Sequence, residues 1–189
     1  MPFMSLPVIM SLSPRGGGNS DQAADFFARC LHGGSHVLRL RDHHVEPCTG
    51  CGACAVDGVC RMSGEDAAEE LFARLDQASG LVLTAPVYFY HLPSQAKAWI
   101  DRAQCRYMAR QGGRAAGSVR PAYVVLLAGR TRGEKLFEGI LPTLRYFLDA
   151  LDFRLEGTAL LRGIDEAGDF SRSSEAMQAV RDLAGRSGW

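Results

Sequence analysis

The sequence has 189 residues, of which 47 % are hydrophobic and 22 % are charged, and its formal net charge is zero. This composition predicts one globular domain whose core suffices for folding without disulfides or a structural metal. The balanced charge gives no support to nucleic-acid binding. No apolar run approaches the ~20 residues of a membrane span, and "MPFMSLPVIMSL" lacks the basic residues of a signal peptide. We therefore expect a cytoplasmic protein with no membrane partner.

Strand-like and helix-like segments alternate along the chain. Strand-like runs occupy 7–12, 36–41, 81–85, 122–128 and 153–161, and helix-like segments occupy 20–31, 63–78, 94–110, 134–151 and the stretch from about Ser173. The helix over 63–78 opens with a pattern that resembles a capping box, formed by Ser63 and Asp66. Pro142 either kinks the fourth helix or marks its start.

This alternation predicts a parallel sheet with helices on both faces. The first, third and fourth runs are apolar throughout, as expected of strands buried on both sides. The second and fifth mix Arg and Glu into an alternating pattern, which favours the edges of the sheet. The expected fold is therefore a doubly wound, flavodoxin-like α/β domain of order 2-1-3-4-5, spanning 1–189 with a cysteine-rich insertion at about 46–62. Ligands bind such sheets at the carboxyl ends of strands one and three.

Two loops are expected at that position. The first, "SPRGGGNS" (13–20), joins glycines and hydroxyl groups to the start of a helix, which suits a phosphate; a flexible turn with a helix cap at Asn19 or Ser20 is the alternative. The second begins at "TAPVYFYHLP" (84–93) and places large aromatic rings in a loop. These rings favour either a planar apolar ligand or a seal over the core or a subunit contact.

Four cysteines follow the second strand with the spacing Cys48-x₂-Cys51-x₂-Cys54-x₅-Cys60. In a reducing compartment such clusters are more often ligands or redox groups than disulfides. The triple spacing is that of bacterial [4Fe–4S] ferredoxins, with Cys60 as a local fourth ligand, whereas structural zinc more often uses two separated pairs. Cys30 and Cys105 lie in expected helices, and we interpret both as small buried hydrophobes.

Motifs in these three loops occur together in one family. Ser-Pro-Arg-x-x-Gly-Asn-Ser follows the first strand, Cys-x-x-Cys-x-x-Cys the second, and Pro-Val-Tyr-Phe with Lys-x-x-x-Asp-Arg the third. From about residue 7 to 160 the chain resembles the NADPH-dependent FMN reductase superfamily, and within it the iron–sulfur flavoproteins. Leu12 and Ser20 depart from the common pattern of Gly and Thr, but neither removes a hydrogen-bond donor.

The resemblance implies a flavin-dependent oxidoreductase with FMN as its catalyst and no acid–base catalytic residue. The residues that would hold the FMN phosphate are Ser13, Arg15, Gly18, Asn19 and Ser20. Those that would line the flavin ring are Pro86, Val87, Tyr88 and Phe89, with a weaker match at Gly129 and Arg130. Cys48, Cys51, Cys54 and Cys60 would hold a [4Fe–4S] cluster, which a purified sample can lose.

The leading functional hypothesis is electron relay between FMN and this cluster in a homodimer or homotetramer. The alternatives are an NAD(P)H-dependent FMN or quinone reductase with vestigial cysteines, and a non-enzymatic redox or metal-sensing module. Arginines at 102, 106, 110 and 114 recur at helical spacing. We interpret them first as a solvated face, and otherwise as a docking site for an acidic carrier such as ferredoxin or for the 2′-phosphate of NADPH. The acidic residues near 65–70 could also meet them across a subunit boundary.

Overall fold

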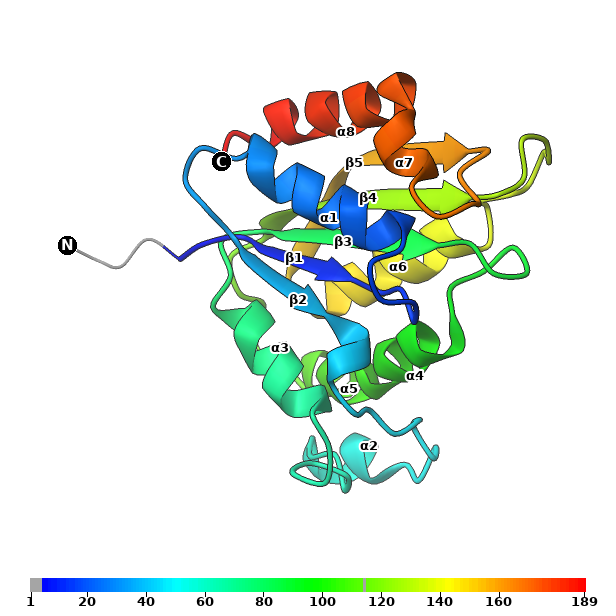
Figure 1. Ribbon diagram of the computed structural model, residues 1–189. Coiled ribbons are helices and arrows are strands. Elements are labelled where there is room, and N and C mark those ends of the chain that lie inside the picture. Colours follow the sequence, from blue (N-terminus) through cyan, green and yellow to red (C-terminus); the bar gives the residue numbers. More distant parts are fainter. Residues whose placement is uncertain (1–4, 114) are drawn as a thin grey trace.

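The structure is a computed structural model that describes residues 5–113 and 115–189. Five parallel strands form one sheet of order β2-β1-β3-β4-β5, which confirms the predicted topology (Figure 1). The strands are β1 (Val8–Ser11), β2 (His36–Arg39), β3 (Leu81–Pro86), β4 (Arg120–Ala128) and β5 (Phe153–Arg162).

Burial along the strands explains this order. β1 and the central parts of β3 and β4 are buried, whereas β2 is partly or fully exposed and β5 mixes buried and exposed positions. Val8 pairs with His36 on one side and with Leu81 on the other, so β1 lies inside the sheet next to the reversal of strand order. The apolar runs therefore fill the centre, and the charged runs form the edges, as predicted.

Helices cover both faces of the sheet. In Figure 1, α1, α7 and α8 lie above the sheet, whereas α3, α4, α5 and α6 lie below it. Helix α2 lies lower still, within residues 46–62, which we call the cysteine segment. Their bounds are α1 (Asn19–Cys30), η1 (Leu40–Asp42), α2 (Ala53–Asp57), α3 (Ala68–Asp76), α4 (Ser94–Arg102), α5 (Gln104–Gln111), α6 (Ile140–Ala150), α7 (Asp169–Arg172) and α8 (Ser174–Ser187). The last helix begins next to Ser173, as expected, and the structure shows that Ser173 caps it: its side chain accepts a hydrogen bond from the Ala176 N–H.

Each face of the sheet has its own apolar core. In the lower core Trp99 stacks on Phe72, with ring centroids 5.4 Å apart, and meets Phe147 edge-on at 5.0 Å. These three rings come from α4, α3 and α6, so they join the helices of that face to one another.

Two expected helices differ in the structure. The predicted capping box at Ser63 and Asp66 is wrong, because the helix begins at Ala68 and Ser63 lies in a turn whose N–H bonds to the Cys60 carbonyl. Asp66 still accepts a hydrogen bond from the Ala68 N–H at 3.0 Å. The segment 94–110 is two helices, because Ala103 ends α4 and precedes α5.

Pro142 lies in the first turn of α6, which begins at Ile140. A proline is tolerated there because that N–H has no partner inside the helix. Of the two alternatives for Pro142, the structure therefore supports a helix start. None of the helices within the described residues is long and apolar enough to cross a membrane.

The aromatic trio gives a test of the core. Replacing Trp99 with Ala should lower the free energy of unfolding by about 3–5 kcal/mol, because the cavity cannot be refilled by its packed neighbours. Urea denaturation followed by circular dichroism measures the change. Tyr146→Ala on α6, where the side chain is 79 % exposed, should change it by no more than about 0.5 kcal/mol. Equal losses in the two variants would contradict this account of the core.

Candidate functional site

The glycine-rich loop and the loop after β3 meet at the carboxyl ends of β1, β3 and β4. They line one cavity of about 230 Å³. Of the residues predicted to bind a flavin, those that line it are Ser13, Arg15, Gly18, Asn19, Ser20, Pro86, Val87, Tyr88 and Gly129. Phe89 and Arg130 lie outside this lining, so their contact with a flavin stays a prediction.

The glycine-rich loop leads directly into α1. Gly18 stands at the cap position without a side-chain cap, so neither Asn19 nor Ser20 caps the helix. Gly17 has a φ of 66°, a left-handed conformation that a side chain would strain. The Gly17 N–H donates to the carboxylate of Asp21, in the first turn of the helix, at 2.8 Å.

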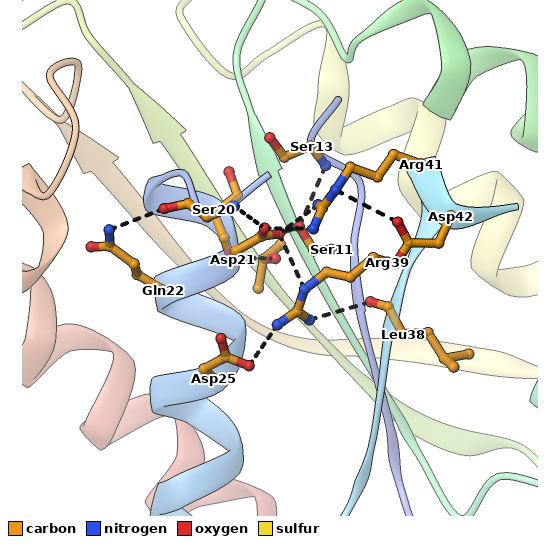
Figure 2. Close-up of polar contacts among 12 residues, drawn as sticks. Ser11, Ser13, Ser20, Asp21, Gln22, Asp25, Leu38, Arg39, Arg41 and Asp42 are labelled. Atoms are coloured by element: carbon orange, nitrogen blue, oxygen red, sulfur yellow. Dashed lines mark hydrogen bonds and ion pairs between the residues drawn. The ribbon is translucent and has the colours of Figure 1, made fainter. Parts of the chain in front are cut away.

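Asp21 is the centre of a buried polar network (Figure 2). The residue is 3 % exposed, and its carboxylate accepts a 2.6 Å hydrogen bond from the Ser11 hydroxyl at the end of β1. Arg41 contributes two contacts, at 3.0 and 2.9 Å, and Arg39 a third at 3.3 Å. One carboxylate thus joins the end of β1, the glycine-rich loop, α1 and the end of β2.

The network sets the ionisation of Asp21. Burial alone would raise the pKa of this carboxyl, but hydrogen bonds from Arg41, Ser11 and Gly17, together with the Arg39 charge, outweigh burial and lower the pKa. The side chain is therefore ionised at neutral pH.

The other polar residues of the loop differ in how far they are already engaged. Ser13 exchanges hydrogen bonds with the backbone of Arg15, at 3.2 and 3.1 Å. Asn19 donates to the Glu166 carbonyl at 2.9 Å and accepts from the Phe170 N–H at 3.2 Å, so it fixes the loop before α7. The Arg15 side chain is exposed and forms no ion pair within the described residues. Among the described residues that line this cavity, Arg15 is thus the cation without an ion pair.

The loop after β3 forms a tight turn. Tyr88 and His91 exchange backbone hydrogen bonds at 2.8 Å in both directions. Between them Phe89 and Tyr90 have φ values of 49° and 62°, which are unusual for bulky residues. Phe89 is fully exposed at the tip. A strained turn that holds an aromatic ring in solvent is typical of a ligand or contact surface.

Gly129 approaches Asp165 closely across the cavity rim. A Cβ on Gly129 would lie 2.6 Å from the Asp165 carboxyl carbon, so no larger residue fits without movement. The next residue, Arg130, turns away, and its guanidinium lies 5.7 Å from the centre of the Tyr90 ring. Gly129 therefore lines the cavity, whereas Arg130 lies outside the lining and contacts Tyr90 of the aromatic turn.

The four clustered cysteines line a second cavity, of about 410 Å³, which shares no lining residue with the first. Its walls are the cysteine segment and the facing parts of α4 and α5. Left-handed glycines at 50, 52 and 58 bend the segment around the short helix α2. Cys48 and Cys51 are exposed, Cys54 and Cys60 are partly buried, and all are free thiols.

These thiols are close enough to act on one another. Burial, followed by repulsion from Cys48, Cys51 and Cys60, raises the pKa of the Cys54 thiol against a backbone hydrogen bond that lowers it. Within the described residues, no three metal-binding side chains already converge on one point. Four thiols around one cavity nevertheless form the donor set that an iron–sulfur cluster requires. The cysteine segment would have to close so that the four sulfur atoms converge.

The predicted solvated arginine face is wrong. Arg102 is buried and paired with Asp66; Arg106 pairs with Asp76 at 2.8 Å; Arg110 pairs with both Asp149 and Asp152. Arg106 also lies 3.6 Å from Glu69 of α3, so the acidic helix and the arginine-bearing helix meet within one chain. Arg114 lies outside the described residues.

The two remaining cysteines differ. Cys30 packs against the upper core, as predicted for a small hydrophobe, but it is only partly buried. Cys105 is buried, as predicted, but its thiol lines the cysteine cavity and donates to the Gly58 carbonyl at 3.0 Å.

Sequence reasoning missed Asp21, Arg39 and Arg41. Asp21 stands in the first turn of a helix, where an acid is ordinary. Both arginines belong to a run that alternates as any edge strand does. The only available signal was that this run and the glycine-rich loop were both predicted at one edge of the sheet.

The fold and the first cavity define a flavodoxin-like α/β protein with a ligand cavity at the reversal of strand order. Residues 5–155 match the family described as NADPH-dependent FMN reductase, and the chain belongs to that family. It is thus a member of a family of flavin oxidoreductases.

Curated relatives are iron–sulfur flavoproteins of archaea. The chain is 32 % identical over 97 residues to that of Methanosarcina thermophila, covering 50 % of this chain and 50 % of the relative. It is 31 % identical over 93 residues to one from Archaeoglobus fulgidus, covering 48 % and 41 %. The chain thus spans half or less of the length of the curated relatives it matches.

Solved structures share the fold at low identity. NAD(P)H:quinone oxidoreductase from Methanothermobacter marburgensis superposes with a TM-score of 0.70 at 18 % identity, over 97 % of this chain and 94 % of the other. An FMN-dependent NADH-azoreductase from Bacillus anthracis in complex with FMN gives 0.64 at 15 % identity, over 97 % and 99 %.

The Asp21 network predicts a pH-dependent loss of stability. Asp21→Asn should lower the free energy of unfolding at pH 7 by about 1.5–3 kcal/mol, because charge-assisted hydrogen bonds are lost. The lowered native pKa means that this contribution is present above the unfolded value of about 4 and is lost as the pH falls below it. Urea unfolding at pH 7 and 3.5 should therefore show a smaller difference between variant and wild type at the lower pH.

Asp25→Asn is the matched control. Asp25 also pairs with Arg39, at 2.6 Å, but its side chain is 46 % exposed, so its loss should cost no more than about 1 kcal/mol. A difference between Asp21→Asn and wild type that widens at low pH would contradict the assignment of an ionised Asp21.

Proposed function

We propose that this protein is an FMN-dependent oxidoreductase that relays electrons between FMN and a [4Fe–4S] cluster. The observation that carries the proposal is the meeting of the glycine-rich loop and the aromatic turn around one cavity, with four thiols around a second. FMN, when bound, supplies the conversion of two-electron hydride chemistry into single-electron steps, and the cluster carries one electron at a time.

The residues at the first cavity suit the two ends of FMN. Arg15 and the hydroxyls of Ser13 and Ser20, with the N-terminus of α1, would hold the phosphate. Asn19 would act chiefly by fixing the loop, since its amide is already bonded. Pro86, Val87 and Tyr88 would lie against the ring, with Phe89 above it and Gly129 and Arg130 on the far side.

Helix α4 relates the two cavities. The loop before it lines the first cavity, and Arg102 at its end lines the second. The nine residues of this helix rise by about 13 Å, and they lie along the chain between the two sites. The thiols of Cys48, Cys51, Cys54 and Cys60 would bind the cluster at its far end.

Two observations favour a second function, an NAD(P)H-dependent FMN or quinone reductase without a cluster. The four thiols do not already converge, and a quinone oxidoreductase is among the structural neighbours. NAD(P)H would be the electron donor in that case.

The proposal includes a homodimer or homotetramer in the cytoplasm. An acidic electron carrier such as ferredoxin stays a prediction. Arg102, Arg106 and Arg110 are engaged within the chain, so a carrier or a nicotinamide phosphate would need another site.

Anaerobic purification with iron, sulfide and flavin analysis tests the proposed function. We expect one FMN and about four irons and four sulfides per chain. Cys51→Ala should lose most of the iron, whereas Cys30→Ala, outside the cavity, should keep it. Yellow, iron-free protein that oxidises NADPH would favour the reductase. Colourless protein that ignores FMN would contradict both and leave a redox or metal sensor.

Arg15→Gln tests the phosphate end of the first cavity. Loss of a charge-assisted hydrogen bond should weaken FMN binding at least about tenfold, measured by quenching of flavin fluorescence. Arg29→Gln, at the opposite end of α1, should leave the dissociation constant unchanged. Equal affinities in the two variants would contradict a phosphate at the glycine-rich loop.

A further inference from the structure

Arg102, the last residue of α4, lies between the body of the α/β domain and the cysteine segment. The side chain of Arg102 has no exposed surface, although arginine is rarely buried completely. It lines the cysteine cavity together with Cys60 and Cys105. Neither flavin binding nor cluster ligation, as proposed above, explains why a cation is buried there.

Arg102 binds both ends of the cysteine segment. One terminal nitrogen, Nη1, donates to the Glu46 carbonyl at 3.2 Å, two residues before Cys48. The other, Nη2, donates to the Met62 carbonyl at 3.3 Å, two residues after Cys60. A planar guanidinium can span two carbonyls in this way because its donors form a rigid fork. The ends of the four-cysteine segment are thus fixed to a single side chain.

Asp66 completes this attachment. It pairs with Arg102 and accepts hydrogen bonds from the Glu46 N–H at 2.8 Å and the Ala68 N–H at 3.0 Å. Its side chain is 1 % exposed. The acid therefore compensates the buried cation while it anchors the segment to the start of α3. Asp66 is not part of the cavity lining, so the cation of the pair is the member nearer the thiols.

The arginine is also an electrostatic neighbour of Cys60. Burial would lower the pKa of the Arg102 guanidinium, but the hydrogen bond and charge of Asp66, followed by the Cys60 thiol, outweigh burial and raise the pKa. Its Nε atom is buried and has no hydrogen-bond partner within the described residues. A positive group with an unused donor thus lies beside one of the four candidate ligands.

We propose that Arg102 is a positioning residue of the cysteine site, which holds the two ends of the segment together and raises the reduction potential of the cluster bound there. This inference rests on the proposed function. Four thiolates give the cluster a negative charge, and reduction by one electron makes that charge more negative. A fixed cation at the cavity therefore stabilises the reduced form more than the oxidised form.

Three variants separate charge from anchoring. Arg102→Met removes the charge and both carbonyl bonds, and Arg102→Lys keeps the charge but loses the fork. Arg106→Met is the matched control, because Arg106 also forms ion pairs, with Glu69 and Asp76 of α3, but does not line the cavity. FMN content and far-ultraviolet circular dichroism establish that each variant is folded.

The measurements on cluster-loaded protein are the reduction potential, from a dithionite titration followed by electron paramagnetic resonance, and the rate of iron loss to a chelator. Arg102→Met should have a lower potential than wild type and should lose iron about tenfold faster, as expected for the loss of a charge-assisted hydrogen bond. Arg102→Lys should recover the potential but not the rate. Arg106→Met should match wild type in both.

Wild-type potential and wild-type iron retention in Arg102→Met would overturn the proposal. If that variant does not fold, Arg102→Lys decides, and iron loss at the wild-type rate would overturn it. A wild-type chain that takes up no iron contradicts the proposed function and the effect on potential. Anchoring is then judged by alkylation of Cys60 with iodoacetamide: faster reaction in Arg102→Met than in wild type and Arg106→Met supports it, and equal rates overturn it.

Discussion

The buried carboxylate of Asp21 is the contact on which the first site depends. It receives Ser11 from β1, Gly17 from the glycine-rich loop, and Arg39 and Arg41 from the end of β2. A buried charge is tolerated only when it is paired and fully hydrogen-bonded, so each of these partners is required by the others. The result is that the loop which would hold a phosphate has one shape before any ligand arrives. Such preorganisation lowers the ordering cost of binding.

The cysteine site likewise depends on a buried charge that is paired and hydrogen-bonded. The Arg102–Asp66 pair is also buried, and it also binds backbone groups of an otherwise exposed segment. The difference lies in the sign of the central charge. At the glycine-rich loop the central group is an anion, Asp21, which binds two arginines. At the cysteine segment it is a cation, Arg102, which lies beside the thiols. Helix α4 joins the two, because the aromatic turn precedes it and Arg102 ends it.

The fold could be predicted because it follows from patterns local to each element. Apolar runs identified the buried strands, and the charged runs at 36–41 and 153–161 identified the edges. The glycine-rich and cysteine-rich loops were evident for the same reason. The buried ion pairs could not be predicted, since Arg39 and Asp66 are ordinary surface residues in any local window. Their burial results from long-range packing. The arginine repeat after Asp101 was mistaken for a solvated face for the same reason, because its acidic partners lie far away in the sequence. The helix start at Ala68 was missed because Ser63 and Asp66 have the spacing of a capping box, whereas Ser63 lies in a turn before the helix.

The Asp21 network also constrains how the first cavity can bind an anion. The Gly17 N–H is already donated to Asp21, so it is not available to a phosphate. Asn19 is likewise occupied by the segment before α7. The positive charge of Arg41 and Arg39 is largely offset by Asp21 and Asp25. An incoming phosphate must therefore rely on Arg15, the hydroxyls and the remaining N–H groups at the start of α1. For this reason the exposed Arg15 would carry the net attraction for a phosphate in the proposed site, whereas the more buried Arg39 and Arg41 hold the shape of the loop.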